Sequence, residues 1–130
     1  MPTVSRRQIL VPEMSSYILI VWLHFLGDFI LQSDRMALNK SKSNYWLTQH
    51  AFAYIAPFLP LCRVYGGTGG MSYFLAVNVA AHWLVDWVTS RITAKLWAAG
   101  QRHWFFTCIG FDQAIHMTVL FLTFNWLVLK

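Results

Sequence analysis

Three pairs of a histidine and an aspartate lie four residues apart inside runs of apolar residues. They are His24/Asp28, His82/Asp86 and, in reverse order, Asp112/His116. On an α-helix this spacing places both side chains on one face, one turn apart. The 130-residue chain has only five acidic residues, and three of them belong to these pairs. Charged groups in such apolar surroundings must find partners, because an unpaired buried charge is costly.

The composition favours a membrane protein. Hydrophobic residues make up 57% of the chain and charged residues only 12%, whereas soluble domains carry about 25% charged residues. The net charge of +5 would suit nucleic acid, but the basic residues lie in short connectors rather than along one folded face. No nucleic-acid partner is therefore expected. We predict a multi-pass protein of the bacterial inner (cytoplasmic) membrane, with the lipid bilayer as its partner.

Four apolar segments are long enough to cross a bilayer as helices. They cover residues 14–31, 45–64, 71–89 and 104–129. Residues 1–13 are expected to form an N-terminal lead-in, and residues 14–130 one four-span transmembrane domain. Pro57 and Pro60 should kink the second segment, because proline interrupts a helix. The predicted fold is all-α, an integral membrane four-helix bundle.

The first and third segments share the pattern His-x-Leu-x-Asp, and an arginine follows each of them. This similarity leaves open a bundle of two repeated helical hairpins. Four spans place both ends of the domain on one side of the membrane. Six of the ten basic residues lie in the connectors on the other side: Arg35, Lys40, Lys42, Arg91, Lys95 and Arg102. The excess of basic residues in these connectors predicts that the connectors face the cytoplasm.

Polar residues from all four segments fall at similar depths. Counting helical turns from the basic connectors places one residue of each segment in a common layer: Asp28, His50, Asp86 and Asp112. The paired histidines lie about one turn deeper. Three unpaired aspartates in a membrane would cost on the order of 8–10 kcal/mol. A bound cation would remove most of that cost.

The polar layer therefore predicts a metal site. Imidazole nitrogens and carboxylate oxygens suit a divalent transition metal, zinc first, with iron or manganese as alternatives. The predicted ligands are His24, Asp28, His82, Asp86, Asp112 and His116. This set exceeds one tetrahedral shell, so it indicates either two ions or one ion surrounded by further His–Asp hydrogen bonds.

A bound metal would turn water into a nucleophile near neutral pH. The expected function is therefore a metal-dependent hydrolase, with Asp28 and His50 as catalytic residues and His50 acting as ligand or general base. The substrate would be a lipid or lipid-linked phosphate near the cytoplasmic face, with its head group held by the basic connectors. A homo-oligomer is compatible with this interpretation.

Other interpretations stay open. The pairs would also suit a non-enzymatic phage membrane protein that conducts ions or protons, forms holes or acts on host membranes. Each histidine and aspartate would equally suit a hydrogen-bonded pair within its own helix that serves packing alone. The basic residues would then only anchor the topology of the spans. His103 is expected at the membrane interface. Gln32 and Gln113 would support the ligands or simply bond at the ends of their segments.

Several stretches resemble a family of small phage and bacterial integral membrane proteins catalogued as a domain of unknown function. The resemblance rests on residues 24–32, residues 39–42, His50 and the pair His82/Asp86. It covers residues 17–122 and implies no activity. A more distant likeness, in residue type and setting, links the chain to LexA-regulated putative membrane-bound metal-dependent hydrolases. The chain lacks the Pro-Asp-x-Asp and Thr-His-Ser elements of that group.

Overall fold

The computed structural model describes the backbone of residues 6–66 and 69–129, and the side chains from residue 14 onward. This described part is helical and contains no strand, which confirms the predicted all-α fold. The helices are α1 Arg6–Phe25, η1 Leu26–Ile30, α2 Asp34–Asn39, α3 Asn44–Ile55, η2 Ala56–Phe58, α4 Leu61–Tyr65, α5 Gly70–Ala98, α6 Arg102–Thr123 and η3 Phe124–Val128.

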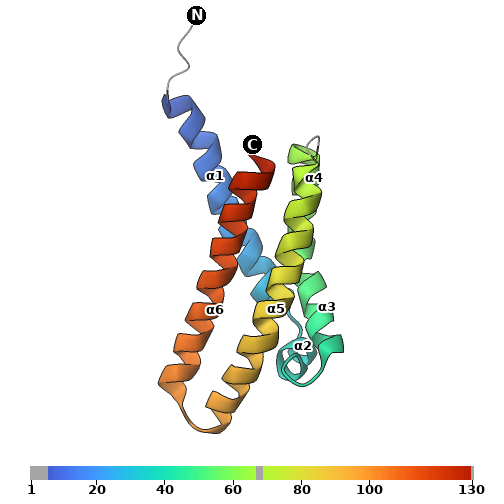
Figure 1. Ribbon diagram of the computed structural model, residues 1–130, viewed down its shortest axis with the longest axis vertical. Helices are drawn as coiled ribbons and strands as arrows, with labels where there is room; N and C mark the ends of the chain where they lie inside the picture. The colour runs from blue at the N-terminus through green and yellow to red at the C-terminus, as the bar shows by residue number, and fades with distance from the viewer. Residues whose placement is uncertain (1–5, 67–68, 130) are drawn as a thin grey trace, which may run out of the picture.

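The helices form four rods that lie side by side (Figure 1). The rods are α1 with η1, α3 with η2 and α4, α5 alone, and α6 with η3. They correspond to the four apolar segments expected from the sequence. The rod α1 begins at Arg6, which is within the expected lead-in, and residues 1–5 of that lead-in lie outside the described residues. The start of α1 and the end of η3 lie at one end of the bundle, and the connector that contains α2 and the turn between α5 and α6 lie at the other.

Two rods are interrupted where they approach the middle of the bundle. The turn η1 is a π-helix, closed by a hydrogen bond from the Leu31 amide to the Leu26 carbonyl at 2.9 Å. The predicted proline kink is confirmed, since α3 ends before Pro57 and a short 3-10 turn, η2, follows. Gly27 lies against α3 so closely that a Cβ there would collide with the backbone carbonyl of Tyr54.

The connector between the first two rods holds a short helix that the sequence analysis missed. Ser33 caps this helix, α2, because its hydroxyl accepts a hydrogen bond from the Met36 amide at 3.3 Å. The connector between α5 and α6 is tighter and turns at Gly100, whose φ of 71° is readily adopted only by glycine. Both connectors lie at the same end of the bundle (Figure 1).

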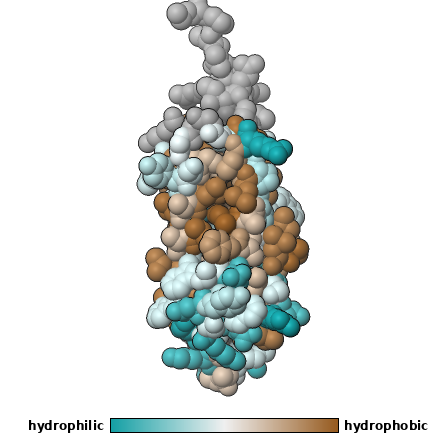
Figure 2. Space-filling model, turned by 90° about the vertical axis from the view of Figure 1, so that its right-hand side faces the viewer, coloured by the Kyte–Doolittle hydropathy of each residue, from teal (hydrophilic) through white to brown (hydrophobic). Residues whose placement is uncertain are grey.

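The interior of the bundle is divided into two zones. An apolar cluster fills the end where α1 begins, and its fully buried members include Tyr54, Phe58, Phe74, Leu120 and Phe124. Next to it, toward the connectors, lies a layer of buried histidines and aspartates. The outer surface instead carries many exposed large apolar side chains, which gather above a hydrophilic end in Figure 2.

Length and composition identify one helix in the described part that is suited to cross a membrane. It is Arg102–Val128, which comprises α6 and η3, while Met14–Ile30 is a shorter apolar helix. Four spans are thus confirmed as helical rods but not as membrane spans. The apolar helix of the first rod and α3 are short, and in α5 the polar residues Asn78, His82 and Asp86 lower the hydropathy although all three are buried inside the bundle.

Candidate metal centre

Every rod contributes to one buried polar layer. The first rod supplies Asp28 from the π turn η1, the second supplies His50 from α3, and the third and fourth supply residues of α5 and α6. Its members, each at most 8% exposed, are His24, Asp28, His50, His82, Asp86, Asp112 and His116. The structure thus places together the residues that the depth argument expected to meet, and their roles as ligands stay a prediction.

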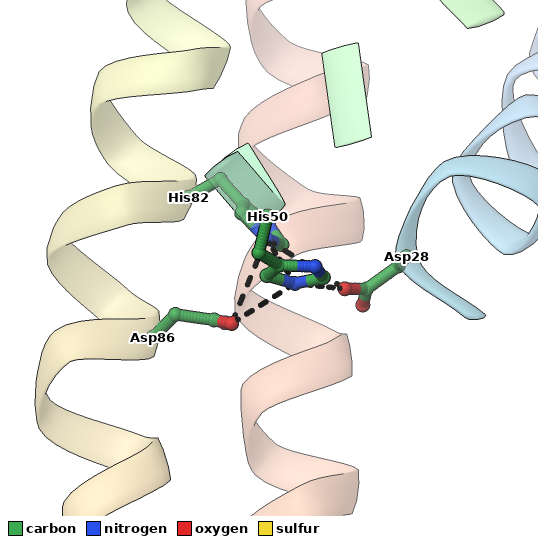
Figure 3. A group of neighbouring side chains, drawn as sticks. All are labelled: Asp28, His50, His82 and Asp86. Atoms are coloured by element: carbon green, nitrogen blue, oxygen red, sulfur yellow. Dashed lines mark hydrogen bonds and ion pairs between the residues drawn. The ribbon is translucent and has the colours of Figure 1, made fainter. Parts of the chain in front are cut away.

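Four of these side chains direct one atom each toward a common point. They are Asp28, His50, His82 and Asp86 (Figure 3). The Nε2 atom of His50 lies 3.0 Å from His82 Nε2, 3.1 Å from Asp28 Oδ1 and 3.2 Å from Asp86 Oδ2. The Nε2 atom of His82 lies 3.6 Å from each of the same two carboxylate oxygens. We call these four residues the first group.

The spacing within the first group suits a tetrahedral metal ion. An ion with bonds of about 2.0–2.2 Å to nitrogen and oxygen holds its four ligand atoms about 3.3–3.6 Å apart. Five distances within the first group are 3.0–3.6 Å, and all four atoms lie within 4.8 Å of one another. Two imidazoles and two carboxylates also form a donor set that zinc, iron and manganese accept.

Local structure explains why these atoms meet. His82 and Asp86 are four residues apart on the uninterrupted helix α5, so they lie one turn apart on its inner face. The absence of a side chain at Gly27 lets η1 approach α3, which brings Asp28 within reach of His50. The Nδ1 atoms of His50 and His82 are buried without a hydrogen-bond partner among the described residues, so ring packing must orient these imidazoles.

Asp112 and His116 belong to an adjacent second group, which also includes Asp28. The carboxylate of Asp112 accepts a hydrogen bond from the Thr89 hydroxyl at 2.6 Å and lies 3.2 Å from His116 Nε2. His24 is in neither group. Its Nε2 atom lies 2.7 Å from Gln113 Oε1 and 3.8 Å from Asp28 Oδ2, so it contacts the site without facing the first group.

Residues 17–130 match the model of a family described as a protein of unknown function, DUF3307. The chain belongs to the DUF3307 family. The match covers both groups and confirms the resemblance to a domain of unknown function. No curated protein and no solved structure matches the chain. The chemistry of this DUF3307 member must therefore be inferred from its own side chains.

Lys40 is the member of the site that the sequence analysis did not identify. Its ammonium donates a hydrogen bond to Asp86 Oδ2 at 2.8 Å and lies 3.4 Å from His50 Nε2. With the imidazoles neutral, three aspartates and one lysine leave the layer with a net negative charge, which favours bound cations. No periodic pattern marks Lys40, because it follows α2 in the connector and reaches the site only through the path of the chain.

The two glutamines have different surroundings. Gln113 donates hydrogen bonds from Nε2 to Asp28 Oδ2 at 2.8 Å and to Asp112 Oδ2 at 3.1 Å, so it supports the predicted ligands. Gln32 has a buried Oε1 atom without a hydrogen-bond partner among the described residues. His103 is exposed and packs edge to face on Trp104, away from the polar layer of this DUF3307 member.

A cavity of about 560 Å³ adjoins the polar layer. Its wall includes the carboxylates Asp28, Asp86 and Asp112 together with Lys40 and Lys42 of the connector. Toward the turn between α5 and α6 the wall becomes apolar, with Trp97 and Phe105 packed against each other and Ile109 and Ala94 beside them. The DUF3307 member thus has a cavity with an anionic base, a basic rim and an apolar side.

Proposed function

We propose that this DUF3307 member is a membrane-embedded, metal-dependent hydrolase that acts on a lipid or lipid-linked phosphate. The observation that carries the proposal is the first group, in which four buried nitrogen and oxygen atoms from three rods have the spacing of a tetrahedral metal site. Zinc is the preferred ion, with iron or manganese as alternatives.

The distribution of polarity supports a multi-pass location in the bacterial inner membrane. The histidines and aspartates of the polar layer are buried, whereas large apolar side chains on several rods face outward, with Trp22 65%, Phe106 64% and Trp126 57% exposed. A water-soluble bundle shows the opposite arrangement, and a large exposed apolar surface indicates contact with lipid or protein. The polar inner face of α5 explains why a simple hydropathy window does not identify it as a span.

The connectors would then face the cytoplasm. They carry most of the basic residues and form the hydrophilic end seen in Figure 2. Arg91 and Arg102 each lie over a neighbouring tryptophan ring, with the guanidinium 4.3 Å and 3.6 Å from the ring centroid respectively. Basic and tryptophan side chains together are typical of the interface between lipid and water.

In this proposal a bound divalent ion supplies a water of lowered pKa as the nucleophile. The chain supplies the remaining functions. His50 acts as a ligand rather than as a general base, because its Nε2 atom lies within 3.2 Å of three other atoms of the first group. Asp28 lies between the first group and the residues of α6, which gives it a central role in holding the reacting groups.

The cavity favours an anionic substrate with an apolar chain. Lys40 and Lys42 offer ammonium groups at the rim, and such groups bind phosphate oxygens. Trp97, Phe105 and Ile109 provide an apolar wall beside that rim, so an acyl or prenyl chain would lie against them. A soluble phosphate would leave this apolar surface uncovered.

The alternative of an ion or proton path is less consistent with the bundle. Conduction needs polar groups or water from one end to the other. The apolar cluster adjoining the layer contains Phe58, Phe74 and Phe124, each 0% exposed, which leaves the layer accessible from the connector end. We therefore favour hydrolysis. Assembly into a homo-oligomer stays a prediction.

Elemental analysis tests the proposal. Protein expressed in metal-supplemented medium and purified in mild detergent should retain at least one equivalent of a transition metal. Asp86→Asn should lose it, whereas Asp34→Asn, the same change at an exposed position of α2, should keep it. Chelation should abolish release of phosphate from prenyl or diacylglycerol phosphates, and zinc or manganese should restore it. Wild-type protein without metal after reconstitution would refute the proposal.

A further inference from the structure

The two carboxylates of the first group each present their oxygens to different sides. Asp28 directs Oδ1 toward His50, at 3.1 Å, and directs Oδ2 toward Gln113 of α6, at 2.8 Å. Because one oxygen is sufficient for the first group, the second oxygen of Asp28 is available to another partner. A carboxylate placed in this way joins two neighbouring sites.

Asp86 repeats this arrangement from the opposite rod. Its Oδ2 atom lies 3.2 Å from His50 Nε2, and its Oδ1 atom lies 3.1 Å from His116 Nε2. The Nε2 atom of His116 is also 3.2 Å from Asp112 Oδ2. These separations match those of the first group. His116 is thus surrounded by carboxylate oxygens in the way that His50 is.

The residues around His116 form a second set of donor atoms. Asp28, Asp112 and His116 each offer one atom, these atoms lie within 4.8 Å of one another, and all three side chains are buried. The second oxygen of Asp86 lies 3.1 Å from His116 Nε2 at the edge of this set, which itself comprises two carboxylate oxygens and one imidazole nitrogen. Manganese, iron and zinc accept such a set.

We propose that the layer holds two divalent ions, with Asp28, the residue common to both groups, bridging them. This inference rests on the proposed function for its first ion and adds a second ion at Asp28, Asp112 and His116. Paired ions typically lie about 3.5–4 Å apart and stabilise both the attacking and the leaving oxygen of a phosphoryl centre. A paired centre would suit the phosphate ester of the proposed function.

The side-chain amide of Gln113 provides a means of changing the donor atoms at the proposed site of the second ion. Its amide nitrogen now lies between Asp28 and Asp112, where it donates a hydrogen bond to each, and its oxygen faces His24. Rotation of the amide by half a turn exchanges the two atoms. The oxygen then faces the second ion, and the amide nitrogen donates to His24, which explains why His24 lies beside the site but in neither group.

Metal stoichiometry in the full-length protein in detergent tests the inference. Titration with Mn²⁺ should show two equivalents bound to wild-type protein, and electron paramagnetic resonance should show the multiline spectrum of an exchange-coupled pair. Asp112→Asn and His116→Gln should each bind one equivalent and show an uncoupled spectrum. The matched variants Asp34→Asn and His103→Gln, at exposed positions, should keep two coupled ions.

The outcomes separate this inference from the proposed function. One equivalent in folded wild-type protein, lost in Asp86→Asn but kept in Asp112→Asn, would overturn the second ion and leave the first intact. No bound metal in wild-type protein would overturn both. Because the wild-type stoichiometry and spectrum decide by themselves, a variant that fails to fold does not prevent a conclusion.

Discussion

The ring of Tyr54 stacks on the ring of His82, with centroids 3.7 Å apart and planes inclined by 8°. His82 Nδ1 has no hydrogen-bond partner among the described residues, so ring contacts such as this stacking help to fix the direction of Nε2. Tyr54 also belongs to the apolar cluster. One side chain therefore connects the apolar end of the bundle to the polar layer.

Replacement of Tyr54 should separate packing from ring orientation. Tyr54→Phe keeps the stacked ring and should keep metal affinity within about twofold, whereas Tyr54→Ala loses a stacking contact of about 0.5–1.5 kcal/mol and should bind metal more weakly. Tyr54→Ala removes the ring and should lower the free energy of unfolding by about 3–5 kcal/mol. Competition with a chromophoric chelator measures metal affinity, and thermal denaturation in detergent measures stability. Equal metal affinity in both variants would show that stacking does not orient His82.

Gly27→Ala should weaken the site through the backbone. The added methyl group would meet the Tyr54 carbonyl and push η1 away from α3, which separates Asp28 from His50. Overpacking of this kind costs about 1–3 kcal/mol, and metal affinity should fall by about tenfold or more. Gly110→Ala is the matched control, because a Cβ there meets no atom within 4 Å. If the two variants bind metal equally well, close approach of η1 to α3 is not required.

Local patterns were sufficient to predict the rods. Long apolar runs, two prolines and the four-residue spacing of His82 and Asp86 are features of continuous chain, and the structure has the expected helices and kink. The meeting of all four rods at one layer followed from counting turns. The duplication of two hairpins stays a prediction, since the first hairpin is interrupted by η1 and η2 while α5 is continuous.

Other features depend on the tertiary path and had no sequence signal. The π turn η1 begins just after His24, and His24, which corresponds to His82 in the sequence pattern, faces Gln113, whereas Asp28 joins the first group. Lys40 reaches Asp86 because α2 folds the connector back under α3. Which carboxylate oxygen faces which partner is likewise decided by the packing of separate rods.

Lys40→Met should strengthen metal binding. The ammonium lies 2.8 Å from Asp86 Oδ2 and 3.4 Å from His50 Nε2, so it must leave these atoms before a cation binds them. A charge-assisted hydrogen bond contributes about 1.5–3 kcal/mol, and partial exposure reduces this, so we expect about tenfold tighter binding. Hydrolysis of lipid phosphate should fall in the same variant, because the rim loses one ammonium group.

Lys95→Met is the control for this experiment, because Lys95 is exposed on α5 and carries the same charge. It should leave metal affinity unchanged. Unchanged or weaker metal binding in Lys40→Met would show that the ammonium does not compete with the cation. Isothermal titration with Zn²⁺ at two salt concentrations measures both variants.

Leu84→Asp tests whether the outer surface contacts lipid. Leu84 is 62% exposed on α5, between His82 and Asp86 in the chain, so it lies at the depth of the polar layer. In water such a change alters stability by about 0.5 kcal/mol or less, whereas in a bilayer it costs about 2.5–3.5 kcal/mol. The variant should therefore lose retention in the membrane after alkaline extraction.

Leu38→Asp makes the same change in α2, at the connector end, where Leu38 is 69% exposed. Because that end would face water, this variant should remain in the membrane fraction as the wild-type protein does. Quantitative immunoblotting of extracted membranes compares the two. Equal retention of both variants would place the exposed face of α5 in water or against a protein partner. The buried polar layer would then bind its cation within a protein assembly rather than within a bilayer.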